Sequence, residues 1–235
     1  DTMVSYFVCY NDFESEVIKM RYDYKKEFKE LYHPKTTPSI IEVPKMNFIA
    51  IRGQGDPNEE NGEYQQCLKL LYGIAYTLKM SPKQNYQIDG FFDYVVPPLE
   101  GFWWQEGVTG SIDYQNKAAF QFIALIRLPD FVKQEDFNWA KKQATLKKKL
   151  DFSKVEFLTY KEGLCVQCMH LGSYDDEPKT IELMNQSIQN LGYELDRNNT
   201  RYHHEIYLSN PRKQSISKLK TVIRQPIKRK GDHDE

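Results

Sequence analysis

The clearest candidate for chemistry in this sequence is Glu205, a lone carboxylate inside the short run from His203 to Leu208. This run predicts a β-strand that ends at Pro211. Because successive side chains of a strand point to opposite faces, Glu205 shares one face with Tyr207, and the other face is apolar. If the apolar face packs on helices, Glu205 points into solvent, as most charged side chains do. If instead the first face lines a cleft, Glu205 forms the floor of an aromatic pocket.

Two kinds of chemistry follow from a desolvated carboxylate in such a cleft. As an anion, Glu205 would hold lipophilic cations, helped by the faces of neighbouring aromatic rings. Burial is also expected to raise its pKa, which is typical of site residues. As a base with a raised pKa, it would activate water against a strained electrophile, while a tyrosine hydroxyl donates to the developing oxyanion. The aromatic content of 14% supplies residues for the walls of a cleft.

Composition excludes several other classes of protein. With 235 residues, 40% of them hydrophobic, and a net charge of -1, the chain has no global field that attracts nucleic acid or an anionic membrane. No apolar run approaches the roughly 20 residues that span a bilayer. We therefore expect a cytoplasmic protein with no nucleic-acid partner, no membrane partner and no cofactor. No metal site is expected either, because Cys165 and Cys168 would point to opposite faces of one strand.

Periodicity and turn signals predict the elements that position Glu205. Helices are expected over 63–80, over 130–149 and from Pro178, the last with a buried stripe of Ile181, Met184, Ile188 and Leu191. Strands are expected over 38–52 (two, separated by a turn at Pro44), 90–96, 101–105, 118–128, 153–160 and 164–170 (joined by a turn), and 203–208, with a helix or strand over 217–224.

The predicted elements repeat along the chain. The order strand, turn, strand, acidic loop, helix, strand occurs over 38–98 and again over 153–211. We therefore predict an α+β fold, one domain over 20–235, built from two repeats (about 38–104 and 153–212) with pseudo-twofold symmetry around a central ligand cleft. Residues 1–19 differ from the rest of the chain, and we expect them to be a non-native leader before an initiator at Met20.

Five segments in this order resemble the stand-alone GyrI-like small-molecule-binding proteins. They are Phe48–Asn58, Glu63–Lys79, Val95–Trp104, Met169–Pro178 and His203–Arg212, and the resemblance extends from about Met20 to Lys228. These proteins are related to the effector-binding domains of multidrug-responsive transcription regulators. The resemblance implies tandem strand-helix-strand-strand units around an aromatic cleft, with an acidic residue on the last main strand, here Glu205. We do not expect the DNA-binding domain of the regulators before Pro38.

The resemblance also implies candidate site residues. Some stand-alone members hydrolyse the strained cyclopropane ring of DNA-alkylating natural products, and a tryptophan and the cleft glutamate are implicated. The matching catalytic residues are Glu205 and Trp104, or Trp103 if the register shifts by one. The full set of candidate ligand-binding residues is Glu205, Tyr207, Trp103, Trp104, Tyr94, Met169 and Tyr174. Plain core packing is the alternative role for the tryptophans, Tyr94 and Tyr174. Phe122 stands where a tryptophan is expected, which argues against any one particular substrate.

The functional expectation is therefore a protein, monomeric or homodimeric, that binds a planar hydrophobic or cationic compound for sequestration or detoxification. Hydrolysis of cyclopropane-bearing alkylators would extend this function. The alternative is a protein-interaction module, such as an inhibitor acting on gyrase, which needs no buried carboxylate.

Overall fold

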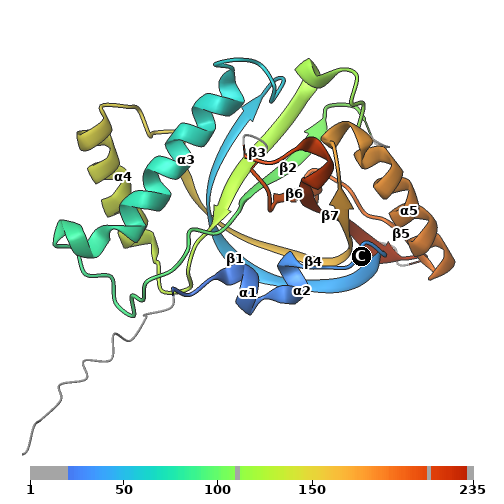
Figure 1. The fold of residues 1–235 in the computed structure, drawn as a ribbon, viewed down its shortest axis with the longest axis horizontal. Helices are drawn as coiled ribbons and strands as arrows, with labels where there is room; N and C mark the ends of the chain where they lie inside the picture. The colour runs from blue at the N-terminus through green and yellow to red at the C-terminus, as the bar shows by residue number, and fades with distance from the viewer. Residues whose placement is uncertain (1–20, 109–111, 211–212, 232–235) are drawn as a thin grey trace, which may run out of the picture.

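The computed structural model describes residues 21–108, 112–210 and 213–231, so the predicted leader, Met20 and Pro211 lie outside the described residues. Within them the fold is mixed α/β (Figure 1). Seven described strands form one antiparallel sheet in the order β4-β1-β3-β2-β6-β7-β5, and β7 also pairs with β4. Six of these strands therefore close into a barrel.

The bounds of the strands and helices are as follows. The strands are β1 Ser39–Gln54, β2 Leu99–Gln105, β3 Phe120–Arg127, β4 Glu156–Leu171, β5 Tyr193–Leu195, β6 His203–Tyr207 and β7 Lys220–Arg229. The helices are α1 Tyr24–Glu27, α2 Lys29–Tyr32, α3 Glu63–Lys79, α4 Gln134–Lys148 and α5 Glu177–Asn190. Short 3-10 turns occupy Ser81–Gln84, Lys117–Ala119, Tyr174–Asp176 and Ile216–Lys218. None of the described helices is long and apolar enough to cross a membrane.

Two predicted strand pairs are single long strands, so the predicted turns at Pro44 and around Gly163 were wrong. β1 and β4 each run for 16 residues. Pro44 lies where β1 pairs only with β4, because β3 pairs with β1 only from Phe48 onward. A strand with one neighbour tolerates a proline. Gly163 takes a φ of +74° opposite Val43, which lets β4 bend without ending.

The strand predicted over 90–96 was also wrong. The backbone here forms a single bridge between Tyr22 and Tyr94. Tyr22 donates its N–H to the Asp93 carbonyl, and Val95 donates to the Tyr22 carbonyl. This segment therefore pairs with the backbone at Tyr22, just before α1, and not with the main sheet.

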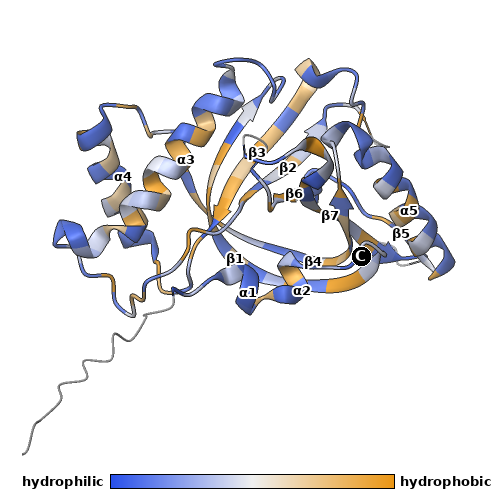
Figure 2. Cartoon of the chain, viewed as in Figure 1, coloured by the Kyte–Doolittle hydropathy of each residue, from blue (hydrophilic) through white to orange (hydrophobic). Residues whose placement is uncertain are grey.

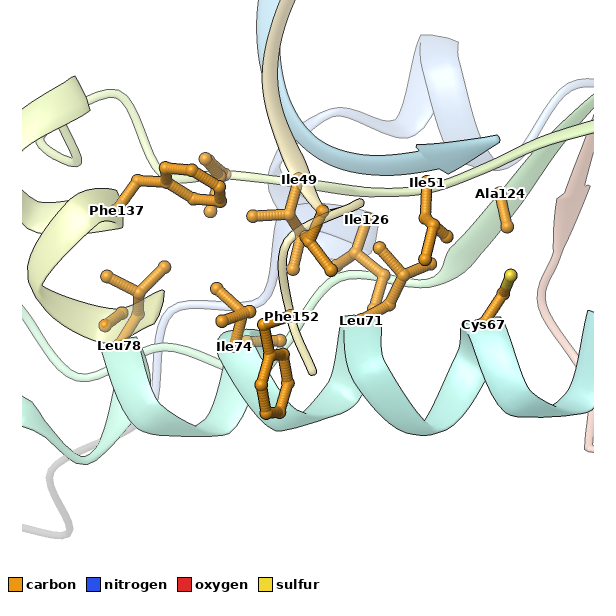
Figure 3. Close-up of a cluster of buried hydrophobic side chains, with 14 of the residues drawn as sticks. Ile49, Ile51, Cys67, Leu71, Ile74, Leu78, Ala124, Ile126, Phe137 and Phe152 are labelled. Atoms are coloured by element: carbon orange, nitrogen blue, oxygen red, sulfur yellow. The ribbon is translucent and has the colours of Figure 1, made fainter. Parts of the chain in front are cut away.

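Helices α3 and α4 cover one outer side of the barrel and were correctly predicted (Figure 1). Figure 3 shows α3 directing residues of one side toward Ile49 and Ile51 of β1, at the spacing of an amphipathic helix. Figure 2 shows a largely hydrophobic β3 beside α3. Both α3 and α4 show mixed colouring, as expected for helices with one buried side. Phe137, Ala140 and Ala144 of α4 are buried, at the spacing of a helix with one buried side.

Helix α5 covers the opposite outer side. Its predicted stripe is buried at Ile181, Met184 and Ile188, which pack with residues of β4 and β7. Leu191 was predicted to join them but is 59% exposed, because the helix ends one residue earlier and the helical period stops there. The two cysteines of β4 belong to different buried clusters, Cys165 inside the barrel and Cys168 beneath α5, as strand alternation predicts.

Inside the barrel lies a fully buried network of charged side chains. Arg224 donates to Glu162 at 2.9 Å, and His204 lies between Glu162 at 3.1 Å and Glu100 at 3.0 Å. The N-terminal arm, α1 and α2, closes this part of the barrel: Arg224 also donates to the carbonyl of Leu31. The arm is thereby bonded to the barrel interior.

The element order strand-helix-strand-strand occurs twice, as β1-α3-β2-β3 and as β4-α5-β6-β7. Each long first strand pairs with the last strand of its own half, β1 with β3 and β4 with β7. The halves meet where β1 pairs with β4 and where β2 pairs with β6.

Candidate ligand-binding site

The candidate site lies on the outer face of β2 and β6, between α3 and α5 (Figure 1). In the register of these strands Gly101 pairs with Glu205 and Trp103 pairs with His203. The side chains of Trp103, His203 and Glu205 therefore lie on the same outer face of the sheet. A Cβ at position 101 would lie 2.5 Å from the indole nitrogen of Trp103. Glycine is therefore required where the tryptophan ring folds back over β2.

A chain of hydrogen-bond donors converges on Glu205. The indole N–H of Trp103 donates to the Tyr207 hydroxyl at 2.9 Å, and that hydroxyl donates to Glu205 Oε2 at 2.8 Å. His203 Nε2 lies 2.9 Å from Glu205 Oε1. The Gln225 amide donates to His203 Nδ1, which leaves the Nε2–H of His203 to donate to Glu205. Each carboxylate oxygen of Glu205 therefore has a donor.

A second carboxyl group, that of Glu177, lies against the first. Glu177 is the first residue of α5 and is fully buried. One carboxylate oxygen of Glu177 lies within 4.8 Å of a ring nitrogen of His203 and of a carboxylate oxygen of Glu205. The Tyr114 hydroxyl donates to Glu177 Oε2 over a long 3.4 Å, and Glu177 Oε1 has no hydrogen-bond partner among the described side chains and backbone. The site thus holds two carboxyl groups but donors sufficient for one.

The two carboxyl groups have opposite pKa shifts. Burial alone would raise the pKa of Glu205, but the hydrogen bonds from His203 and Tyr207 outweigh it, and the pKa lies below 4.5. Burial and the adjacent Glu205 raise the pKa of Glu177 well above 4.5. These directions run against the raised pKa expected for Glu205, and they favour Glu205 as the anion of the pair and Glu177 as its protonated partner.

Aromatic rings line this site. Trp103 contacts Tyr64 of α3 with ring centroids 5.3 Å apart, and Phe122 with centroids 5.6 Å apart. Tyr174 meets Tyr207 edge to face at 5.8 Å. Burial raises the pKa of Tyr174 to about 12, so its hydroxyl stays protonated at neutral pH. These rings supply apolar area together with neutral O–H donors.

The loop after β2 contributes Tyr114 by way of a buried glutamine. Gln105 Nε2 donates to the carbonyls of Asp113 and Asn116, and Gln105 Oε1 accepts from the Asp113 N–H. Burial raises the pKa of Tyr114, whose hydroxyl points at Glu177. The amide of Gln105 therefore fixes the loop that carries this donor.

The structure brings together four of the predicted site residues: Glu205, Tyr207, Trp103 and Tyr174. The other three lie elsewhere. Trp104 points to the opposite face of β2 and packs on Tyr202 at 4.9 Å, because adjacent residues of a strand alternate. Met169 belongs to the cluster inside the barrel. Tyr94 is 2% exposed and packs on Phe91 and Phe131 instead of approaching Glu205.

Several site residues were missed from the sequence. His203 carried a usable signal, because it lies two residues before Glu205 and so shares its face of the strand. Glu177 directly precedes the expected helix start at Pro178, and no periodicity could place it beside a strand 28 positions away. Tyr64, Tyr114 and Gln225 were hidden in the same way, since only tertiary packing brings them to the site.

Glu177, His203 and Glu205 are also the one group of potential metal ligands found in the described part of the chain. The hydrogen bond between His203 and Glu205 already uses Nε2 of His203 and Oε1 of Glu205, two atoms that could otherwise coordinate a metal ion. A metal ion would have to replace this hydrogen bond.

An open hollow of about 340 Å³ adjoins the site at the ends of β1, β2 and β3. Trp104 and Phe122 both line the hollow, and Phe122 also contacts Tyr64 and Trp103. A single aromatic side chain therefore borders both the hollow and the ring cluster around Glu205.

A barrel whose outer face presents a buried, aromatic-lined carboxylate between two covering helices has the features of a small-molecule-binding domain. The family model for the GyrI-like small molecule binding domain matches residues 36–228, and the chain belongs to this family. No curated protein matches the chain.

Solved structures agree with this assignment. A hydrolase from Listeria innocua has 42% identity and a TM-score of 0.80, with 88% of this chain and 100% of that chain covered. An uncharacterized conserved protein from Listeria innocua has 44% identity and a TM-score of 0.82, with the same shares covered. The C-terminal domain of EcmrR has 13% identity and a TM-score of 0.52, over 82% of this chain and 98% of that domain, which shows likeness of fold alone.

Proposed function

We propose that this protein binds a planar hydrophobic or cationic small molecule at Glu205 and thereby sequesters or detoxifies it. The observation that carries the proposal is a buried carboxylate, 7% exposed, held by donors from His203 and Tyr207 without an arginine or lysine at hydrogen-bond distance among the described residues. A buried charge without a counter-ion is costly, and a cationic ligand would supply one. The rings of Trp103 and Tyr64 would add cation–π contacts.

Hydrolysis is a proposed extension of binding. A protein of 42% identity from Listeria innocua is described as a hydrolase. An ionised Glu205 beside a protonated Glu177 supplies a base and an acid in one site. With a cyclopropane conjugated to a carbonyl, Glu205 would take a proton from water as the oxygen attacks a ring carbon. The breaking C–C bond would deliver its electron pair to the carbonyl, whose oxygen would receive a proton from Glu177.

The proposal predicts a tryptophan-fluorescence response to ligands. Wild-type protein titrated with planar cationic dyes and cyclopropane-bearing alkylators should show quenching, and Glu205→Gln should lose at least about tenfold in affinity for the cations. Mass spectrometry of the alkylator after incubation would reveal a product heavier by one water. Quenching without product would support binding alone. No quenching by any compound would contradict the proposal and favour the protein-interaction class.

We further propose that the two halves are related by a pseudo-twofold axis near the β2–β6 pair. The repeated element order supports it, as does the pairing of β2 with β6, which are the third elements of their halves. Superposing the backbone of β1-α3-β2-β3 on that of β4-α5-β6-β7 gives the rotation angle that relates the two halves. A rotation far from 180° would contradict it.

A further inference from the structure

Three side chains of the kinds that bind metal ions converge at the site from two elements. His203 and Glu205 come from β6, and Glu177 comes from the first turn of α5. One ligand atom of each residue lies within 4.8 Å of those of the other two. All three residues are buried, and Glu205 is the most exposed of them at 7%. Two carboxyl groups in contact inside a protein do not both ionise without a cation between them.

Two buried oxygens at this cluster have no hydrogen-bond partner among the described groups, namely Glu177 Oε1 and Gln225 Oε1. The amide nitrogen of Gln225 lies against His203 Nδ1. A half-turn of this amide exchanges its nitrogen and its oxygen. Gln225 Oε1 would then accept from the Nδ1–H of His203, and the lone pair of Nε2 would be free. Histidines that bind metal ions commonly donate their other ring N–H to an oxygen in this way.

We propose that Glu177, His203 and Glu205 form a site for one divalent metal ion of the class of Zn²⁺ and Mn²⁺. The ion would be held by Nε2 of His203 and by one carboxylate oxygen from each glutamate, and its two positive charges would balance the two carboxylates. One imidazole nitrogen with two carboxylate oxygens suits these ions, whereas Ca²⁺ and Mg²⁺ take oxygen ligands. The same ion would give Glu177 Oε1 a partner, and the turned amide would give one to Gln225 Oε1.

The spacing of the ligand atoms is close to what such an ion needs. Bonds of about 2.0–2.2 Å place neighbouring ligand atoms about 3.0–3.5 Å apart. His203 Nε2 and Glu205 Oε1 are already 2.9 Å apart. The carboxyl group of Glu177 therefore has to approach these two atoms by little more than 1 Å at most. The ion occupies the space between three ligand atoms and needs no cavity of the size that an organic compound requires.

This inference goes beyond the proposed function, because the metal ion would neutralise the cluster in the absence of any organic compound. Both the ion and an organic cation would use Glu205. They would therefore compete, and added Zn²⁺ should weaken the binding of cationic dyes.

Metal retention and X-ray absorption by the wild-type protein test the site. Tag-free full-length protein, stripped with a chelator and then dialysed against Zn²⁺ or Mn²⁺, should retain about one ion per chain. At the zinc edge we expect only nitrogen and oxygen neighbours, at about 2.0–2.2 Å. A zinc–sulfur distance of about 2.3 Å would place the ion on a cysteine and overturn the assignment. Retention far below one ion per chain for both metals would overturn the site itself.

Matched variants assign the ligands by calorimetric titration with Zn²⁺. Glu177→Gln and His203→Gln each remove a ligand atom and should weaken binding at least about 100-fold. Gln225→Leu removes only the acceptor that orients the imidazole and should weaken binding about 10–100-fold, whereas Gln225→Glu keeps an acceptor oxygen and should restore it. The exposed changes Glu182→Gln and His33→Gln should bind as the wild type does. Unchanged affinity in Glu177→Gln or His203→Gln would overturn the site.

The metal site and the proposed function fail in different ways. Dye binding by a chain that retains no metal ion would overturn the metal site and leave the proposed function intact. Metal retention with no quenching by any dye would support the metal site and contradict the proposed function. Because metal retention and X-ray absorption use the wild-type protein, the inference stays falsifiable if a variant does not fold.

Discussion

Two buried polar clusters lie on opposite faces of the same five-residue strand, β6, and they differ in charge balance. Inside the barrel, Glu100 and Glu162 contact His204, and Glu162 also contacts Arg224. Outside, Glu177 and Glu205 share the donors of His203, Tyr207 and Tyr114. The inner cluster brings as many basic groups as acidic ones. The outer cluster has no arginine or lysine at hydrogen-bond distance among the residues that the structure describes.

The shifts in pKa reflect this difference. Burial alone would raise the pKa of Glu162, but the charges of His204 and Arg224 outweigh it and lower the pKa to about 2. In the outer cluster Glu177 has its pKa raised well above 4.5. The inner cluster pairs its charges within the chain, whereas the outer cluster is where the proposed cationic ligand would bind. Adjacent residues of one strand, His204 and Glu205, thus belong to clusters of different kinds.

The largest expected effect comes from breaking the balance of the inner cluster. Arg224→Met removes the guanidinium donor to Glu162 and should reduce the free energy of unfolding by about 3–5 kcal/mol, because it leaves a buried carboxylate without one of its two charged partners. Urea denaturation measures this loss. The matched outer change, Glu205→Gln, should cost about 1.5 kcal/mol or less because it removes charge from an unbalanced site. Equal losses in the two variants would contradict the comparison.

Glu177→Gln removes one of the two carboxyl groups of the outer cluster. The difference in unfolding free energy between this variant and the wild type should grow with pH. Above about pH 4.5 the unfolded chain ionises Glu177 while the folded chain keeps the proton, so wild-type stability falls as pH rises. Glu177→Gln lacks this loss and should gain relative to wild type by up to about 1.4 kcal/mol per pH unit, starting near pH 4.5. Chemical denaturation at several pH values measures it. Glu182→Gln, on the exposed side of α5, serves as the control and should show no such gain.

A smaller effect is expected from the hydroxyl that joins Trp103 to Glu205. Tyr207→Phe removes the donor to Glu205 and leaves the indole N–H of Trp103 without its acceptor, at an expected cost of about 1–3 kcal/mol in unfolding free energy. The control is Tyr160→Phe, whose hydroxyl donates to the Thr200 carbonyl in an exposed position and should cost about 0.5 kcal/mol. A similar loss of unfolding free energy in both variants would show that the hydrogen bonds from Trp103 through Tyr207 to Glu205 stabilise the fold no more than an exposed tyrosine hydroxyl does.

The smallest effect is expected from separating the two adjacent tryptophans. Trp103→Phe keeps an aromatic ring at the site, so cation affinity should fall only severalfold, about 0.5–1 kcal/mol, while most of the ligand-induced quenching is lost. Trp104→Phe alters the opposite face of β2 and should leave affinity and quenching unchanged. Fluorescence titration of both variants checks this. If Trp104 proves to carry the quenching, the site lies on the other face of the strand.

Much of the secondary structure was predictable because its signals are local. α3 and α4 follow from apolar spacing, and strand alternation correctly placed Glu205 and Tyr207 on one face. Pro44 and Gly163 misled the prediction, since a turn signal and a tolerated break in a long strand look alike in sequence. Whether a proline ends a strand depends on how many neighbours that strand has, and neighbours are set by tertiary pairing.

The candidate site was less predictable than the strand that carries it. The choice between Trp103 and Trp104 depends on a single step of strand register, which turns every side chain to the other face. Glu177 comes from the first turn of a helix whose capping pattern gave no reason to expect a second role. The pKa expectation for Glu205 failed for the same reason: its shift is decided by donors on other strands and by a neighbouring acid.

The N-terminal arm precedes the residues that the family model matches, but it makes hydrogen bonds to the barrel interior. The family match begins at residue 36, yet the carbonyls of Glu30 and Leu31 accept hydrogen bonds from Gln167 and Arg224 in the barrel interior. A recombinant chain trimmed to the matched residues would retain every sheet strand and still deprive a buried guanidinium of one of its acceptors. The match by sequence therefore leaves out residues whose backbone carbonyls bond to buried side chains of the barrel.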